Sequence, residues 1–125
     1  MNISVILPSI NRINILDKCL NSLFNNSSQH NIQIVLITED INTKNFIESC
    51  TYKKDSFEIS LAFQEEKRGY MGAWNNGLKY IKHDVVIPIG DDGLLQPNAL
   101  DKILDKYNSF GSGIIGFNDG YIPNE

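Results

Sequence analysis

Two hydrophobic patterns alternate along the chain. In one, short continuous apolar runs rich in β-branched residues end at glycine, proline or polar residues, which is typical of buried strands. In the other, apolar residues recur every three or four positions, which predicts helices packed by one stripe. The continuous runs predict strands at 3–8, 32–37, 57–63, 85–89 and 114–117. The spaced stretches predict helices at 13–24, 42–49, 67–81 and 97–107, the second capped by Asn42 or Thr43.

The predicted strands and helices follow one another in turn, with connections short enough for parallel pairing. We therefore expect an α/β fold, a three-layer α/β/α sandwich around a mostly parallel sheet. At 125 residues the chain is long enough for one compact domain, which we expect to span 1–125. No apolar run approaches the roughly 20 residues of a membrane-spanning helix. The N-terminus also lacks the basic region of a signal peptide, so we expect a cytoplasmic protein without a transmembrane segment.

Charge and the rare titratable residues exclude several classes of protein. A net charge of -4 gives no general attraction for nucleic acid, so a bound phosphate would be held locally or through a cation. Cys19 and Cys50 lack the spacing of metal ligands, and free thiols are favoured over a disulfide. His30 and His83 stand alone in polar surroundings, where solvated positions without a role are expected.

The fourth predicted strand stops at two adjacent carboxylates, Asp91 and Asp92, set between Gly90 and Gly93. In open α/β sheets, ligands bind in the crevice beyond the carboxyl ends of the strands. Neighbouring carboxylates repel each other, and a divalent cation with oxygen ligands would relieve that repulsion. The alternative is an ordinary strand-to-loop turn, since Asp and Gly are common turn residues.

The predicted helix at 67–81 is unusually rich in small residues, among them Gly69, Gly72 and Gly77. Glycine weakens a helix by up to roughly 1 kcal/mol, so several together indicate close approach of the backbone to a sheet or to a ligand. Both alternatives remain open. The dinucleotide fingerprint, the phosphate-binding loop and the nucleophile elbow of hydrolases are all absent from the sequence.

Four separated stretches, in the right order, resemble motifs of glycosyltransferase family 2, which has the GT-A fold of nucleotide-diphospho-sugar transferases. Residues 3–12, ISVILPSINR, are similar to its first strand and "P-T-Y-N-R" turn. Residues 34–40, IVLITED, resemble the strand that runs into "V-D-D". Residues 69–77, GYMGAWNNG, match "G-x-x-x-A-R-N-x-G" with Trp74 in place of arginine. Residues 84–93, DVVIPIGDDG, match the "D-x-D" strand, and Pro97 begins the helix after it.

The resemblance implies a donor site for a nucleotide-diphospho-sugar, a UDP-sugar, with Mn²⁺ or Mg²⁺ as cofactor. It implies that Glu39 accepts the imide N–H of uracil, that Asp91 lies on the ribose side and that Asp92 binds the metal, with Asp91 completing the acid pair. Arg68, with Lys67 beside it, either assists with the phosphates or belongs to a solvated loop. The nucleotide-binding set carried over in this way is Pro8, Ser9, Asn11, Arg12, Glu39, Arg68, Gly69, Asn75 and Asp91.

The sequence also departs from the family pattern. Gly90 stands where the first acid of "D-x-D" is usual, and Glu39 is one methylene longer than the usual aspartate. The resemblance implies that the acceptor-binding half and the catalytic base lie beyond Glu125, so the fold is expected to be truncated and no catalytic base is named. Asp119 follows the last predicted strand without an assigned role.

The resemblance therefore favours a metal-dependent glycosyltransferase domain that would transfer a sugar to a glycan or another acceptor. One alternative is a degenerate domain or sensor that binds the nucleotide-sugar without transferring it. A second is an enzyme similar to cytidylyl- or uridylyltransferases. That class carries a glycine-rich basic loop after the first strand, and residues 8–12 contain no glycine.

Overall fold

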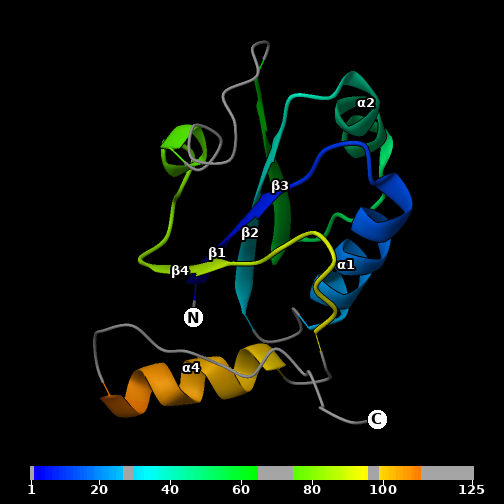
Figure 1. The fold of residues 1–125 in the computed structure, drawn as a ribbon. Coiled ribbons are helices and arrows are strands. Elements are labelled where there is room, and N and C mark those ends of the chain that lie inside the picture. The colour runs from blue at the N-terminus through cyan, green and yellow to red at the C-terminus, as the bar shows by residue number, and fades with distance from the viewer. Residues whose placement is uncertain (1, 27–29, 65–74, 96–98, 111–125) are drawn as a thin grey trace, which may run out of the picture.

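The computed structural model describes residues 2–26, 30–64, 75–95 and 99–110, with side chains through Asp105 (Figure 1). The strands are β1 (Asn2–Pro8), β2 (Asn31–Thr38), β3 (Phe57–Phe63) and β4 (Val85–Pro88), and the helices are α1 (Ile13–Asn25), α2 (Ile41–Ser49) and α4 (Ala99–Phe110). Residues 75–78 are also helical. Residues 67–74 of the predicted helix and the predicted strand at 114–117 lie outside the described residues. Residues 79–81, predicted as the end of that helix, are not helical. None of the described helices combines the length and apolar character that crossing a membrane requires.

The four strands form one parallel sheet in the order β3-β2-β1-β4. The chain first builds outward from β1 to β2 and β3, and then returns to place β4 on the other side of β1. In the register of the sheet, Ile3 of β1 is paired with both Ile32 and Val85. The predicted α/β class and parallel pairing are confirmed, and the strand order reverses between β1 and β4.

Helices cover the sheet on both sides, so β1 and β2 are buried on both faces and their sequences are continuous apolar runs. Figure 1 shows α1 and α2 on one side of the sheet and the short helix at 75–78 on the other. The first face forms the larger core, in which alternate residues of β1 and β2 meet the apolar stripe of α1 and residues of α2 and α4. The second face holds a smaller cluster of Ile6, Val35, Ile37 and Ala62, with Ile81 packed against it.

Gly77 is the one glycine of the predicted helix at 67–81 that lies within the described residues. It is buried, and a Cβ atom at this position would lie 2.3 Å from Ile37 Cδ1. The backbone of residues 75–78 therefore approaches the sheet more closely than a side chain at position 77 would allow. At position 77, close packing on the sheet thus accounts for the glycine. Gly69 and Gly72 lie outside the described residues.

Two local predictions were wrong, one on a helix cap and one on the environment of a histidine. The cap of α2 is Asp40, whose side chain accepts hydrogen bonds from the N–H groups of Asn42 and Thr43, so the helix begins before either predicted cap. The side chain of His30 is only 14% exposed rather than solvated, because α4 brings Asp101 against its Nε2 atom. The imidazole thus joins the start of β2 to α4.

The remaining predictions on cysteine and histidine agree with the structure in part. Both cysteines are free, as predicted, with Cys19 buried and Cys50 partly buried. His83 is partly buried, and its backbone N–H donates to Ser4 Oγ over 3.3 Å.

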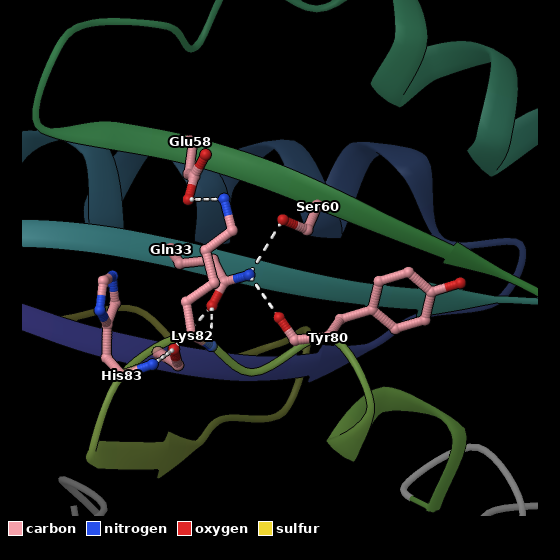
Figure 2. Close-up of polar contacts among 7 residues, drawn as sticks. Gln33, Glu58, Ser60, Tyr80, Lys82 and His83 are labelled. Carbon is pink, nitrogen blue, oxygen red and sulfur yellow. Dashed lines mark hydrogen bonds and ion pairs between the residues drawn. The ribbon is translucent and has the colours of Figure 1, made fainter.

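A buried polar network crosses the second face of the sheet, centred on Gln33 of β2 (Figure 2). Gln33 Oε1 accepts from Ser4 Oγ at 2.7 Å and from the backbone N–H of Lys82 at 3.0 Å. Its Nε2 donates to Ser60 Oγ at 3.0 Å and to the carbonyl of Tyr80 at 2.7 Å. All four hydrogen-bonding positions of the amide are occupied. The network therefore joins β1, β2 and β3 to residues 80–83, which lead into β4.

We expect the substitution Gln33→Leu to lower the free energy of unfolding by at least about 2 kcal/mol. The leucine would remove one hydrogen-bond partner each from the Ser4 and Ser60 hydroxyls, the Tyr80 carbonyl and the Lys82 N–H. A buried polar group that is left unsatisfied costs about 1–3 kcal/mol. Urea denaturation measures the change. As a control, Lys82→Ala removes only the exposed ion pair between Lys82 Nζ and Glu58 Oε1, 2.9 Å apart, and should cost no more than about 1 kcal/mol. Equal stability of Gln33→Leu and the parent would contradict this account.

Candidate functional site

The candidate site lies where the strand order reverses, at the carboxyl ends of β1 and β4. Ligands of open α/β sheets bind at such switch points because the loops from the two strands diverge there. The backbone N–H of Ser9 donates to Ile37 O at 2.9 Å, and the N–H of Ile89 donates to Ile6 O at 3.0 Å. These bonds extend the sheet just past β1 and β4. They fix the starting points of the two loops that carry the candidate residues.

Asp91 is the centre of this site. Its carboxylate is nearly buried, with the side chain 9% exposed. Ser9 Oγ donates to Asp91 Oδ2 at 2.9 Å, and Arg12 Nη1 lies 3.1 Å from Asp91 Oδ1. The structure thus brings together three of the predicted residues, although Asp91 lies 82 positions after Ser9 in the chain. The buried carboxylate is compensated by a half-exposed guanidinium and oriented by a hydroxyl, and each of its oxygens retains a further lone pair.

The neighbouring Asp92 has a different environment. It is exposed, and it lies in a tight turn closed by a 3.0 Å hydrogen bond from the N–H of Gly93 to Gly90 O. A Cβ atom at Gly90 would lie 3.1 Å from Asp92 Oδ1, and one at Gly93 would lie 3.0 Å from Ile89 Cγ2. The acid pair was interpreted either as a cation site or as an ordinary turn. The two interpretations are compatible, because the segment is a turn that presents an exposed carboxylate.

A second carboxylate, Asp40, holds the turn that follows β1. The backbone N–H of Asn11 donates to Asp40 Oδ2 at 3.3 Å. When the side-chain amide of Asn11 is oriented by its hydrogen bonds, its nitrogen lies 2.9 and 3.0 Å from the two carboxylate oxygens. The hydroxyl of Thr43, followed by the backbone N–H groups of Thr43, Asn42 and Asn11, lowers the pKa of Asp40. Asp40 was absent from the predicted site residues, although an aspartate directly before a helix is a recognisable N-cap signal.

Three other predicted site residues lie within the described part of the chain. Pro8 is the last residue of β1 and is paired with Ile37. Glu39 is partly buried one residue beyond β2, and Asn75 is exposed at the start of the helical residues 75–78. Arg68 and Gly69, together with Lys67, lie outside the described residues.

Cys19 of α1 lies beneath the turn that carries the acid pair. Its Sγ atom is 3.8 Å from the carbonyl oxygen of Gly90. Burial, and then the charges of Asp91 and Asp92, raise the pKa of this thiol to about 12. Cys19 is therefore neutral at physiological pH and supports the turn by packing, without the reactivity of a thiolate.

The described residues fit a divalent cation only if the ligand supplies part of its coordination. Within the described ranges, no group of three or more His, Cys, Asp or Glu side chains is arranged to hold a metal ion. Asp91 already contacts Ser9 and Arg12 through both of its oxygens, which leaves Asp92 as the exposed carboxylate. Mg²⁺ is commonly bound by one or two carboxylates together with substrate phosphates, and this arrangement suits such a shared site.

Comparison with known proteins gives one family and one fold. The model of the family described as Glycosyl transferase family 2 matches residues 4–125. Among curated protein sequences, none matches the chain.

Three crystal structures of S. aureus TarS are similar in fold. One has a TM-score of 0.66 at 17% identity, covering 87% of this chain and 20% of TarS. TarS 1-349 has a TM-score of 0.65 at 18% identity, covering 87% of this chain and 33% of that one. TarS 1-349 in complex with UDP-GlcNAc has a TM-score of 0.74 at 17% identity, covering 93% and 37%. The present chain thus spans from a fifth to just over a third of these TarS chains, and the likeness establishes the fold.

We expect Cys19 to resist alkylation in the folded protein. With a pKa of about 12, only about one thiol in ten thousand is ionised at pH 8, and burial also blocks the reagent. In Cys50→Ser, labelling should be slow in buffer and rapid in urea, as followed by mass spectrometry. The matched variant Cys19→Ser should be labelled at the partly buried Cys50 without urea. Rapid labelling of Cys19 in the folded protein would contradict its assigned environment.

Proposed function

The chain belongs to glycosyl transferase family 2, and we propose that it provides the donor site of a glycosyltransferase. The proposed ligand is a nucleotide-diphospho-sugar, a UDP-sugar, bound with a divalent cation, and the sugar is transferred to an acceptor. The observation that carries the proposal is the arrangement of Ser9, Arg12 and Asp91 at the switch point of the sheet. The likeness in fold to TarS, of which one structure is a complex with UDP-GlcNAc, supports the same class of ligand.

Asp91 is proposed to bind the ribose. A carboxylate with both oxygens oriented by protein donors can accept hydrogen bonds from two neighbouring hydroxyls through its remaining lone pairs. Arg12 is half exposed, so it retains N–H donors that can face a phosphate while one nitrogen contacts Asp91. Ser9 fixes the carboxylate from the protein side. In this proposal the three residues orient the nucleoside diphosphate relative to the sheet.

Glu39 is proposed to bind the base. It directly follows β2, the neighbour of β1, so it lies at the same edge of the sheet as the Asp91 site. A glutamate carboxylate can accept the imide N–H that uracil offers. The partly buried position favours a specific hydrogen bond over a fully solvated charge.

Asp92 is proposed to hold Mn²⁺ or Mg²⁺ jointly with the diphosphate of the ligand, with Asp91 beside it in the acid pair. The cation would neutralise the negative charge that develops on the departing diphosphate. The chain's own contribution is to present the Asp92 carboxylate on the hydrogen-bonded turn of residues 90–93. Proton removal from the acceptor is assigned to none of the described residues.

The direct test of the proposed function is calorimetric titration of the chain with UDP, with and without Mn²⁺. We expect UDP binding that Mn²⁺ strengthens in the parent, and loss of that strengthening in Asp92→Asn with little change in melting temperature. Neutralising an exposed site carboxylate removes a cation ligand and relieves repulsion from Asp91. The control Asp55→Asn changes an exposed aspartate before β3, at the opposite edge of the sheet. A parent that binds no UDP would overturn the proposal. If Mn²⁺ strengthened UDP binding to Asp92→Asn as much as to the parent, Asp92 would not be the metal ligand.

The base assignment is tested by Glu39→Gln. Glutamine keeps the size of the side chain but replaces the charged acceptor by a neutral amide, so UDP binding should weaken by about 1.5–3 kcal/mol, roughly 10- to 150-fold. Glu48→Gln is the matched control, because Glu48 is exposed in the last turn of α2 and paired with Lys44. If Glu39→Gln bound UDP as tightly as the parent, the base would have to lie elsewhere.

A further inference from the structure

We propose that the outer edge of β3 is an interaction surface that pairs with β3 of a second copy of this chain. The two strands would run antiparallel about a two-fold axis at Leu61 and join two four-stranded sheets into one. The inference does not depend on the proposed nucleotide site, which lies at the carboxyl ends of β1 and β4. It concerns how the chain assembles.

The backbone of β3 has one side bound to β2 and one side that faces away from the sheet (Figure 1). At the start of the pairing, the N–H of Ile32 donates to Ser56 O at 2.8 Å. At its end, the N–H of Gln64 donates to Thr38 O at 2.9 Å. Even-numbered residues therefore direct their N–H and C=O groups toward β2, because these groups alternate in direction along a strand. The odd-numbered residues, which direct theirs outward, are Phe57, Ile59, Leu61 and Phe63.

The first of the outward-facing residues already has an antiparallel partner. The N–H of Phe57 donates to Lys54 O at 3.0 Å, and its C=O accepts from the N–H of Lys54 at 3.4 Å. Beyond this bridge, none of the described residues pairs with the outer side of β3. Ile59, Leu61 and Phe63 thus offer their N–H and C=O groups to an added strand, starting just after the bridge.

The two edges of the sheet differ in the features that prevent strand addition. Natural edge strands are blunted by short length, by proline or by charge. β4 has four residues and ends at Pro88, which lacks an N–H group. β3 has seven residues without proline, and its one charged residue, Glu58, is paired with Lys82 Nζ at 2.9 Å. Residues 59–63 are uncharged, so β3 is the edge that can accept a strand.

The spacing of the outward groups suits a second copy of the same strand. Antiparallel strands exchange two hydrogen bonds at each hydrogen-bonded pair of opposed residues. When Leu61 faces the same residue of a second copy, Ile59 faces Phe63, and every outward group beyond the Lys54 bridge is paired on both strands. β-Branched and aromatic residues opposed in this way stabilise a sheet.

Charge and symmetry favour a second copy as well. In this register Glu58 faces the uncharged Gln64, so no like charges are directly opposed, although each chain has a net charge of -4. A two-fold axis also closes the assembly at two copies, because β2 occupies the other side of each β3.

The pairing leaves the candidate site accessible. β2 and β1 separate β3 from β4, so the axis lies at the far edge of the sheet from the turn at residues 90–93. Because the two sheets run antiparallel, the two candidate sites lie at opposite ends of the joined sheet. UDP is therefore expected to leave the association unchanged.

Sedimentation and hydrogen exchange of the parent chain test the pairing without any substitution. We expect a dimer to form between about 1 µM and about 1 mM, the range of weak interfaces. When about nine-tenths of the chains are paired, the amides of Ile59, Leu61 and Phe63 should exchange roughly 10-fold more slowly by NMR. The amides of the even-numbered residues and of Phe57 should not change. A monomer at every concentration, or a dimer without this alternating protection, would overturn the proposal.

Charge exchange at Leu61 tests the register. Leu61→Lys and Leu61→Glu each oppose like charges across the axis and should each raise the dissociation constant at least about 10-fold, whereas their mixture should associate. The control Val86→Lys changes a 40% exposed residue of β4 and should associate as the parent does. Circular dichroism checks folding, and if a charged variant unfolds, the exchange measurement on the parent decides. Undiminished association of folded Leu61→Lys, or a mixture of folded variants that stays monomeric, would overturn pairing about Leu61.

Discussion

The pairing of β4 with β1 determines where the candidate site can form. Because β4 returns across the sheet to the inner strand, the turn at residues 90–93 comes beside the turn at residues 9–12. The Gln33 network holds the returning segment through the Tyr80 carbonyl and the Lys82 N–H. A polar side chain in the middle of β2 thus supports a site at the end of the sheet, through the strand that it helps to place.

The secondary structure was largely predictable from the sequence because each pattern has one dominant cause. β1 and β2 are buried on both faces and are therefore continuous apolar runs, whereas α1 is buried on one stripe. The predicted strand at 57–63 has the same bounds as β3. The contacts of His30 with Asp101 and of Gln33 with Tyr80 join residues 71 and 47 positions apart, and no local pattern reports such contacts.

The candidate site was predictable as a set of residues but not as an arrangement. The sequence places Ser9, Arg12 and Asp91 at strand ends, and the structure brings them into contact. Adjacent aspartates look alike in a sequence, yet Asp91 is buried against an arginine and Asp92 is exposed. Asp40 was overlooked because its partner Asn11 belongs to a different loop, so only the fold reveals that they meet.

The close approach of Gly77 to Ile37 couples the side-chain sizes allowed at two positions that are 40 residues apart in the chain. The atom nearest to a Cβ at position 77 is the terminal methyl of Ile37, 2.3 Å away. A mutation that enlarges residue 77 overpacks this contact. Valine at position 37 would lack the terminal methyl and relieve the overlap in part, since the Cγ1 atom of Ile37 is itself 3.0 Å from the added Cβ. The side-chain volumes that the two positions tolerate are therefore coupled, so the substitution Gly77→Ala is better tolerated when residue 37 is valine than when it is isoleucine.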